Sequence, residues 1–298
     1  MNSSTFHGIL PAIITPLDEN GHFAAAPFER LLERVYAAGV DGVYVCGQTG
    51  EGPQLAVEDR KRAAEVAVRC SPKGKLVIVH AGASRPEDAV ELVKHAARCG
   101  ASAVSSLPPA GGYSFEEVAG YYRKLAAASN VPFLVYFFPD VAPAINRVEH
   151  ILELCAIPNV IGLKFTDFDL YRLGLFKQAG AVVFNGRDEV LAAGLMMGAD
   201  GGIGSFYNLI PELFLEVYSL AGANRFVEAR AVQYRINELI QLTLRFPALA
   251  AIKQMLKWSG IDCGPVAEPR RWLTQAEETE LKRQLAASSF AGASFAGA

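Results

Sequence analysis

Eight short apolar segments alternate with eight helical patterns between Ile9 and Leu220, and this alternation restricts the fold more than any other feature of the chain. The apolar segments are Ile9–Thr15, Val43–Cys46, Leu76–His80, Ala103–Leu107, Phe133–Phe138, Val160–Phe165, Val182–Asn185 and Gly201–Ser205. The helical patterns are Pro27–Ala38, Val57–Arg69, Pro86–Arg98, Phe115–Ala128, Arg147–Cys155, Leu170–Gln178, Glu189–Met197 and Pro211–Leu220. Strands this apolar are buried on both faces, as in a parallel sheet, and eight strand–helix units are typical of a (β/α)8 barrel, the TIM barrel.

The competing architecture is a doubly wound open sheet. Such a sheet usually binds a dinucleotide through G-x-G-x-x-G after its first strand, whereas this chain has Pro11-Ala12-Ile13-Ile14-Thr15-Pro16 there. We therefore predict an α/β fold in which residues 1–224 form a (β/α)8 barrel that carries the catalytic site.

Beyond residue 224 the alternation stops, and three helical patterns follow at Arg225–Leu244, Leu249–Trp258 and Thr274–Leu285. Their apolar positions recur with the 3.6-residue period of a helix. They predict a C-terminal three-helix extension over residues 225–285 that packs on the barrel or on a neighbouring subunit. Residues 286–298 contain a repeat of Ser-Phe-Ala-Gly-Ala, and a low-complexity end of this kind predicts a disordered tail.

Composition and charge argue against several classes of protein. The chain is 51% apolar and 20% charged with a net charge of −3, which indicates a large core and no basic surface for nucleic acid or membrane lipid. Its five cysteines form no C-x-x-C pair, which argues against a disulfide framework and a zinc site. The segment Met1–His7 lacks the features of a signal peptide, and no apolar run approaches the ~18 residues of a membrane span. We expect a cytoplasmic enzyme with no metal, no other cofactor, and no nucleic-acid or membrane partner.

One lysine stands inside an apolar strand. Lys164 follows Val160-Ile161-Gly162-Leu163, whereas we expect the other nine lysines in polar helical or loop contexts. Burial disfavours the charged ammonium form, and a neutral amine attacks carbonyl carbons to form a Schiff base. The alternative is a strand-end lysine whose ammonium group reaches solvent. On this segment alone both interpretations stand.

Two polar side chains are expected near Lys164, because chemistry in a (β/α)8 barrel lies at the C-terminal ends of the strands. Thr166 is two positions beyond Lys164, so strand alternation places both on one side. Tyr136 lies near the end of the neighbouring strand, where a phenol can relay protons to and from a substrate hydroxyl. The alternative for Tyr136 is an aromatic residue that fills the core.

The loop after the second strand is rich in glycine and reads Cys46-Gly47-Gln48-Thr49-Gly50-Glu51-Gly52. Glycines let the backbone bend close to a ligand and turn successive N–H groups inward, and Gln48 and Thr49 add side-chain donors. One carboxylate would suit this loop, whereas a Walker phosphate loop is excluded because G-K-[ST] is missing. The alternative is a plain tight turn. We expect Glu51 to fix the loop and not to act as a catalytic acid.

Further polar residues follow the seventh and eighth strands. Asp188 and Glu189 open a helical pattern, where carboxylates ordinarily stabilise the helix N-terminus, but they could also bind the hydroxyls of a polyol. The glycine run before Ser205 would let a substrate approach the barrel backbone closely.

Four motifs in order resemble those of the dihydrodipicolinate synthase/N-acetylneuraminate lyase family of Schiff-base (β/α)8 aldolases, and the resemblance covers His7 to Trp272. The motifs are Gly47-Gln48-Thr49-Gly50-Glu51, Tyr136-Phe137-Phe138-Pro139, Gly162-Leu163-Lys164-Phe165-Thr166 and Gly198-Ala199-Asp200-Gly201-Gly202-Ile203-Gly204-Ser205. The third and fourth motifs, with the residues that follow them, look most like the N-acetylneuraminate lyase branch.

The resemblance implies a role for each matching residue. Lys164 would form the imine with a 2-oxo acid such as pyruvate, Tyr136 would be the proton donor, and Thr49 with the loop amides would bind the carboxylate. The positions that hold the sugar part of the substrate in sialic acid lyases match Thr166, Gly186, Asp188, Glu189 and Ser205. It also implies a homotetramer, built as a dimer of dimers.

The chain departs from the family pattern at three places. Gln48 stands where most members have a serine or threonine, which alters the hydroxyl relay toward Tyr136. Many members carry a tyrosine pair after the fourth strand, contributed across a dimer interface, where this chain has Pro108-Pro109-Ala110-Gly111-Gly112-Tyr113. The arginine that the synthase branch uses is missing from Asp140-Val141-Ala142-Pro143, which argues against dihydrodipicolinate synthesis.

Three hypotheses follow. The leading one is a carbon–carbon lyase that cleaves a 2-oxo sugar acid resembling N-acetylneuraminate to pyruvate and an aldehyde. The second is a related 2-keto-3-deoxy acid aldolase or dehydratase, or a dihydrodipicolinate-synthase-like enzyme, with a smaller substrate. The third is a non-catalytic 2-oxo acid binding protein in which Gln48 has disabled the relay.

Overall fold

The eight apolar segments form short parallel strands in a computed structural model that describes residues 5–297. The strands are β1 (Gly8–Pro11), β2 (Gly42–Val45), β3 (Leu76–His80), β4 (Ala103–Ser106), β5 (Phe133–Phe137), β6 (Val160–Phe165), β7 (Val182–Asn185) and β8 (Gly201–Gly204). They pair in the order β1-β8-β7-β6-β5-β4-β3-β2. A parallel bridge between Ala12 and Tyr44 joins the two ends of the sheet, so it closes into a barrel and confirms the predicted TIM-barrel fold. Residues 1–4 and residue 298 lie outside the described residues. Residues 1–4 belong to the N-terminal segment in which no signal peptide is expected from the sequence.

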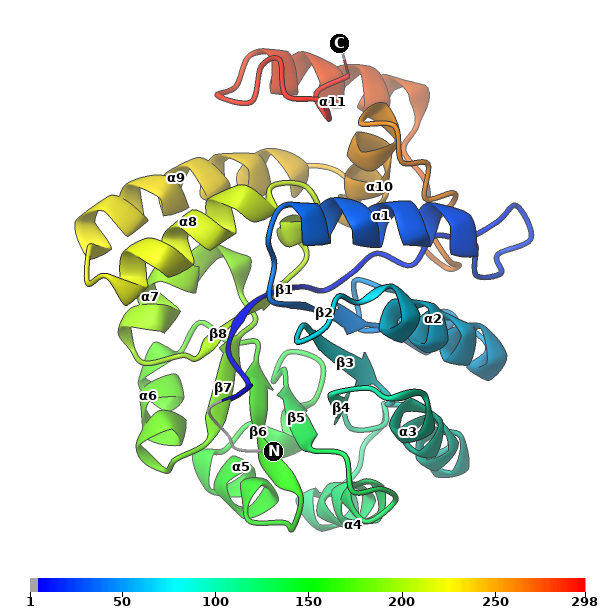
Figure 1. Ribbon diagram of the computed structural model, residues 1–298, viewed down its shortest axis with the longest axis vertical. Helices are drawn as coiled ribbons and strands as arrows, with labels where there is room; N and C mark the ends of the chain where they lie inside the picture. The colour runs from blue at the N-terminus through cyan, green and yellow to red at the C-terminus, as the bar shows by residue number, and fades with distance from the viewer. Residues whose placement is uncertain (1–4, 298) are drawn as a thin grey trace.

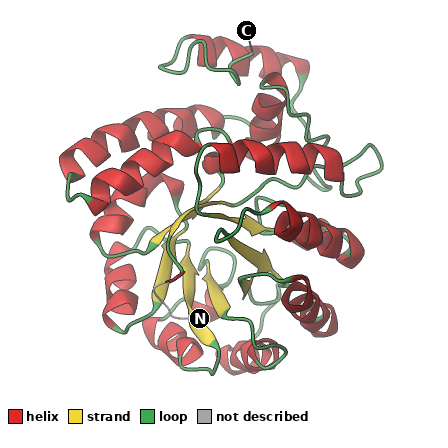
Figure 2. Ribbon diagram, viewed as in Figure 1, coloured by secondary structure: helices red, strands yellow, loops and turns green. Residues whose placement is uncertain are grey.

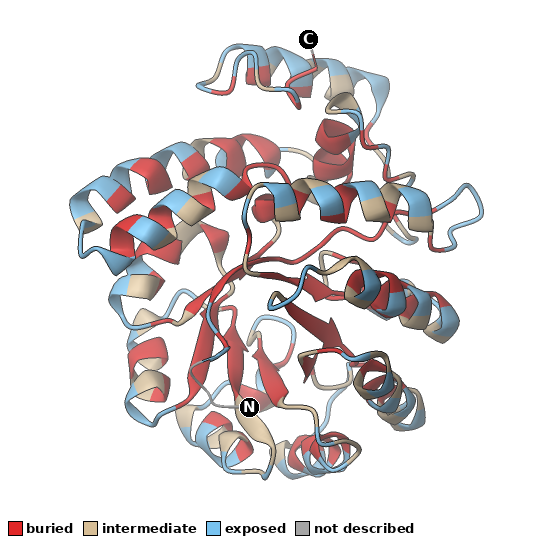
Figure 3. Ribbon diagram, viewed as in Figure 1, coloured by how far each residue is buried: buried red, intermediate tan, exposed pale blue. Residues whose placement is uncertain are grey.

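A helix follows each strand and covers the outside of the barrel, as Figures 1 and 2 show. These helices are α1 (Ala25–Ala37), α2 (Val57–Cys70), α3 (Pro86–Cys99), α4 (Phe115–Ala126), α5 (Val148–Cys155), α6 (Leu170–Gln178), α7 (Leu191–Met196) and α8 (Pro211–Gly222). The buried face of α1 is Phe28, Leu31, Leu32 and Val35, the spacing expected of an amphipathic helix. Strands buried between this ring and the barrel interior appear red throughout most of their length in Figure 3.

Strand alternation decides which side chains enter the barrel. On β6, Leu163 and Phe165 pack outward against the helices, whereas Lys164 between them points inward. The inner cluster contains Tyr44 and Tyr136 among aliphatic side chains from the other strands. Tyr136 of β5 and Lys164 of β6 are direct partners in the register of these two strands. The fold therefore sets these two side chains side by side inside the barrel.

Three helices follow the barrel: α9 (Phe226–Thr243), α10 (Ala248–Trp258) and α11 (Gln275–Ala286). Helix α9 packs on α7 and α8, while α10 and α11 stand beyond them in Figure 1. A capping box of Thr274 and Glu277 starts α11. Within residues 5–297, no helix combines the length and apolarity that a membrane span requires.

The end of the chain differs from the predicted disordered tail. Residues 287–297 form turns in which Phe290 and Phe295 are buried, 5.9 Å apart between ring centroids. Ser289 anchors this segment on α9, because its backbone N–H donates to Glu238 at 3.0 Å. The repeated phenylalanines explain the difference: each Ser-Phe-Ala-Gly-Ala unit carries one large apolar side chain, and burying it favours an ordered position.

Candidate active site

The Lys164 amine is buried beside a phenol. Its side chain belongs to a residue only 4% exposed, so the alternative in which Lys164 reaches solvent is wrong. Nζ donates to the Tyr136 hydroxyl at 3.1 Å. It also lies 4.3 Å from the centroid of the Tyr136 ring and 4.6 Å from that of Tyr44. Two aromatic rings and a hydroxyl thus orient the amine within reach of a proton relay.

The imidazole of His80, whose ring lies 6.0 Å from that of Tyr136, is uncharged. Burial lowers the pKa of His80 well below its usual value, and the positive charges of Arg60 and Lys164 act in the same direction. Both ring nitrogens of His80 are occupied, Nδ1 by the carbonyl of Cys46 at 3.1 Å and Nε2 by the N–H of Leu107 at 3.0 Å. These partners fix the tautomer, with the proton on Nδ1.

Two rings meet Tyr136 edge-on and fix its orientation. The Tyr44 and His80 rings lie 6.1 and 6.0 Å from it, at 85° and 89°. Burial raises the pKa of Tyr44 well above its usual value, so its hydroxyl stays protonated and donates to Ser105 at 3.1 Å. Tyr44 was missed by sequence reasoning, although its inward position follows from the alternation Val43-Tyr44-Val45 on β2.

The glycine-rich loop after β2 brings a hydroxyl to the cavity. Thr49 Oγ1 lies 2.6 Å from Ser205 Oγ, which follows β8. The sharp bend needs glycine at position 52, where a Cβ would lie 1.8 Å from the carbonyl oxygen of Cys46. Ser205, interpreted from the resemblance as a sugar-binding residue, is therefore next to the predicted carboxylate loop and not beyond it.

Glu51 fixes this loop through contacts with the C-terminal extension, as the sequence predicts. Its fully buried carboxylate accepts a hydrogen bond from the N–H of Ala267 at 2.7 Å and forms an ion pair with Lys253 of α10 at 2.7 Å. From the sequence, Lys253 is expected in a polar helical or loop context, like the other lysines apart from Lys164, and this expectation is wrong. Lys253 is as buried as Lys164. It was missed because the helical pattern of α10 showed no buried partner for it; Glu51 lies about two hundred residues earlier in the chain.

The residues predicted for the distal part of a substrate line the opposite wall. Thr166 Oγ1 is buried without a hydrogen-bond partner among the described residues, and a Cβ at Gly186 would lie 2.2 Å from it. Asp188 begins the short helix η4 (Asp188–Val190), and its Oδ2 accepts the N–H of Phe206 at 2.8 Å. Asp188 thus connects the loops after β7 and β8, and its side chain does not cap the helix that follows.

Burial raises the pKa of Asp188 to about 7, and the neighbouring Glu189 adds to the effect, while the Phe206 N–H and Lys164 oppose it. Its second oxygen, Oδ1, is buried with no partner among residues 5–297. A carboxyl group of this kind can donate or accept a hydrogen bond near neutral pH. Asp188 is therefore suited to a substrate hydroxyl.

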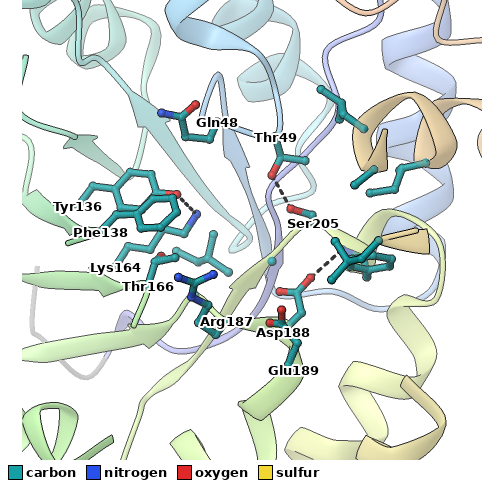
Figure 4. A pocket seen from close by; sticks show the side chains of 18 of the residues that line it. Gln48, Thr49, Tyr136, Phe138, Lys164, Thr166, Arg187, Asp188, Glu189 and Ser205 are labelled. Atoms are coloured by element: carbon teal, nitrogen blue, oxygen red, sulfur yellow. Dashed lines mark hydrogen bonds between the residues drawn. The ribbon is translucent and has the colours of Figure 1, made fainter. Parts of the chain in front are cut away.

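One cavity of about 290 Å³ brings all nine predicted site residues together at the C-terminal ends of the strands (Figure 4). They are Gln48, Thr49, Tyr136, Lys164, Thr166, Gly186, Asp188, Glu189 and Ser205. Sequence reasoning missed other residues that line it, namely Phe138, Arg187, Arg270 and the extension residues Leu244, Ala248, Leu249 and Ile252. Arg187 stands between two residues that the motifs identified, whereas no local pattern points to the extension. Across residues 5–297, no cluster of three or more His, Cys, Asp or Glu side chains is placed to hold a metal ion.

Comparison with known proteins agrees with this geometry. The model of the dihydrodipicolinate synthetase family matches residues 5–288. The chain belongs to this family. Among curated relatives, an N-acetylneuraminate lyase of Rhizobium meliloti is 34% identical over 284 residues, covering 94% of each chain.

Two further comparisons, one with a curated relative and one with a solved structure, give the same family. An N-acetylneuraminate lyase of Mediterraneibacter gnavus is 33% identical over 96% of this chain and 93% of its own length. The solved structure of a catalytic-lysine mutant of the Ruminococcus gnavus sialic acid aldolase superposes with a TM-score of 0.91 at 31% identity, covering 95% of both chains. The family and the barrel fold of this chain are therefore established.

Proposed function

We propose that this protein is a class I aldolase that cleaves a 2-oxo sugar acid to pyruvate and an aldehyde. The observation that carries the proposal is the buried Lys164 amine, 3.1 Å from the Tyr136 hydroxyl inside the cavity at the C-terminal ends of the strands. A buried amine beside a proton relay suits imine formation, and no bound cofactor enters the steps below.

The steps follow from the positions of the side chains. The amine of Lys164 attacks the keto carbon C2 to give a carbinolamine, and the Tyr136 hydroxyl gives its proton to the carbinolamine oxygen, which leaves as water and gives the protonated imine. Thr49, Ser205 and the amides of the glycine-rich loop bind the C1 carboxylate. The Tyr136 oxygen then takes the proton of the C4 hydroxyl, the C3–C4 bond breaks, and its electron pair moves into the imine to give an enamine.

The first product to leave is the aldehyde that contains C4. Tyr136 then gives its proton to C3 of the enamine, and water hydrolyses the resulting protonated imine, which releases pyruvate, restores the amine and returns a proton to Tyr136. Asp188 and Glu189 line the same cavity, and we assign to them the hydroxyl groups of the departing aldehyde. The names of the relatives make N-acetylneuraminate the first substrate to examine.

A second candidate is an aldolase or dehydratase for shorter 2-keto-3-deoxy acids, which would use the same Lys164 and Tyr136. The Gln48 amide lines the cavity where the family pattern predicts a hydroxyl, so the relay beyond Tyr136 is changed. This change favours a third candidate, a non-catalytic 2-oxo acid binding protein, which shares the cavity and differs from both enzymes in turnover.

The test is a substrate screen that measures released pyruvate by coupling it to lactate dehydrogenase. We expect N-acetylneuraminate or a six-carbon 2-keto-3-deoxy acid to release pyruvate, and Lys164→Ala to release none. Cleavage of the shorter acid alone selects the second candidate. Absence of turnover with every 2-oxo acid, although pyruvate binds, selects the binding protein and contradicts the proposal.

The homotetramer stays a prediction from the family resemblance, and so does the cytoplasmic location. Light scattering after size exclusion tests the former, with four times the 32.0 kDa of one chain expected.

A further inference from the structure

One positively charged side chain in the cavity, that of Arg187, has no role in the steps above. Arg187 precedes η4 and lines the cavity together with Lys164. Its Cζ lies 5.2 Å from the ring centroid of Phe138 and 4.5 Å from that of Phe168. Aromatic rings from the loops after β5 and β6 thus hold the guanidinium in place, because both rings favour a cation over their faces.

The charge of Arg187 is only partly compensated. Among the described residues its one ion pair is with Asp140, through Nη2. The Asp140 side chain is 65% exposed and that of Arg187 only 20%, so water screens the carboxylate more than the guanidinium. Nε of Arg187 is buried with no hydrogen-bond partner within residues 5–297. A buried donor without an acceptor is unfavourable, and a ligand oxygen would satisfy it.

The other charged groups of the cavity leave this region positive. Arg270 is engaged by Glu51 at 3.9 Å and by Gln54 at 3.1 Å. Figure 4 shows the guanidinium of Arg187 directed toward Phe138 and Thr166, while Asp188 and Glu189 lie together on the side of Ser205. The hydroxyls of Thr49 and Ser205 therefore mark one end of the cavity and the Arg187 guanidinium another.

We infer that Arg187 makes the cavity selective for 2-oxo acids with a second carboxylate at the end remote from the keto group, in preference to acids with a neutral hydroxyl tail. This inference rests on the proposed function and names its substrate class. The guanidinium donates charge-assisted hydrogen bonds to the remote carboxylate, while the Thr49 loop binds the first one. The C3–C4 bond breaks as described above, and the departing aldehyde carries the second carboxylate away.

The test uses two pairs of probes that differ only at C6, where one member has a carboxylate and the other a CH2OH group. For cleavage the pair is 2-keto-3-deoxyglucarate and 2-keto-3-deoxygluconate, compared by kcat/KM. For binding without chemistry it is D-glucarate and D-gluconate, compared by calorimetry. We expect the wild type to prefer the diacid in both pairs. Arg187→Met should reduce that preference by about 10- to 100-fold, the range for a lost hydrogen bond to a charged group.

The matched control is Asp140→Asn, which removes the partner of Arg187 and leaves its charge. We expect this variant to keep or raise the preference for the diacid, and Arg187→Lys to keep part of it. A structural latch between Arg187 and Asp140 would instead give both Arg187→Met and Asp140→Asn the same loss of melting temperature and no change in preference.

The outcomes separate this inference from the proposed function. Equal cleavage and equal binding of both members by the wild type would overturn the inference while leaving the aldolase intact. If neither keto acid is cleaved, the calorimetric pair decides alone, and the proposed function fails only if N-acetylneuraminate releases no pyruvate either. Tighter binding of D-glucarate that Arg187→Met abolishes supports the anionic site, and equal binding of the two sugars refutes it.

Discussion

Replacing Lys253 by methionine should strongly destabilise the protein, because it leaves a buried carboxylate without its counter-ion. Lys253 and Glu51 are both fully buried, and their charged atoms lie 2.7 Å apart. Burial lowers the pKa of Lys253, and the charge of Glu51 opposes that shift. Methionine fills the space of the lysine stem but supplies no charge and no donor for the carbonyl of Pro265.

The expected magnitude follows from what remains around Glu51. Removing one partner of a buried ion pair costs about 3–5 kcal/mol of the free energy of unfolding. The Ala267 N–H still donates to Glu51 at 2.7 Å, and Arg270 stays 3.9 Å away, so we expect a loss near the lower end, about 3 kcal/mol. Because typical domains are stable by only about 5–15 kcal/mol, this loss is readily measured.

Urea unfolding followed by two signals is the assay. Circular dichroism reports on the whole chain, whereas the two tryptophans both report on the extension, Trp258 at the end of α10 and Trp272 just before α11. Coinciding transitions would indicate a single unfolding step. The Glu51–Lys253 ion pair joins the loop after β2 to helix α10 of the extension. We therefore expect the fluorescence transition of Lys253→Met to occur at a lower urea concentration than its circular dichroism transition, because the extension detaches first.

Lys177→Met is the matched control. Lys177 forms an ion pair of similar length with Asp200, 2.6 Å, and likewise donates to a carbonyl, but the two side chains are 24% and 29% exposed. We expect it to cost about 1 kcal/mol or less. Adding Glu51→Gln to Lys253→Met should recover much of the loss, since the uncompensated charge is gone. The reasoning is refuted if Lys253→Met costs no more than Lys177→Met, or if Glu51→Gln recovers nothing.

Three further predictions concern the cavity. Tyr136→Phe should keep the fold and lower kcat by about 10²–10⁴, as for a lost general acid or base, and near-normal turnover in the coupled pyruvate assay would return Tyr136 to a packing role. Asp188→Asn should gain stability relative to the wild type as the pH rises from about 4 to 7. In the folded wild type the pKa of Asp188 is about 7, so the carboxyl group keeps its proton in this range, whereas the unfolded chain releases it near the ordinary pKa of 3.8. Folding of the wild type therefore becomes less favourable as the pH rises, and asparagine does not titrate. The stability difference should be constant below pH 4 and above pH 7 and should change by roughly 4 kcal/mol between them. A difference that stays constant in urea titrations from pH 4 to 7 would contradict the raised pKa. Thr49→Val should raise the apparent Kd of pyruvate about tenfold in imine-trapping titrations, because the carboxylate loses a hydrogen bond. An unchanged apparent Kd would remove Thr49 from the carboxylate site.

The barrel could be predicted from the sequence because its constraints are local. Strands buried on both faces read as continuous apolar runs, so the segment Val160–Phe165 is identical in the sequence analysis and in the structure. The placement of Lys164 and Tyr136 followed from the rule that barrel chemistry lies at the strand ends, and the register of β5 and β6 sets them side by side. The family motifs added Gln48, Thr49, Gly186, Asp188, Glu189 and Ser205, which line the same cavity.

What the sequence left out depends on contacts between distant segments. Lys253 lies in a helix whose pattern does not reveal that Glu51 is its partner. Ser205 was assigned to the sugar end from the family resemblance, and its distance in sequence from Thr49 hides their contact around the closed barrel. Arg187 carried no motif of its own, and its meaning comes from two rings on other loops. Phe290 and Phe295 looked like part of a low-complexity repeat, although burial gives them ordered positions.

Reductive trapping with pyruvate tests the central claim most directly. Borohydride reduces the imine to a stable secondary amine, and peptide mass spectrometry then identifies the modified lysine. The account predicts a single adduct on Lys164, its loss in Lys164→Ala, and no adduct on Lys253, which is equally buried but held by Glu51. An adduct on Lys253 or on another lysine with Lys164 unmodified, or no adduct at saturating pyruvate, would contradict it.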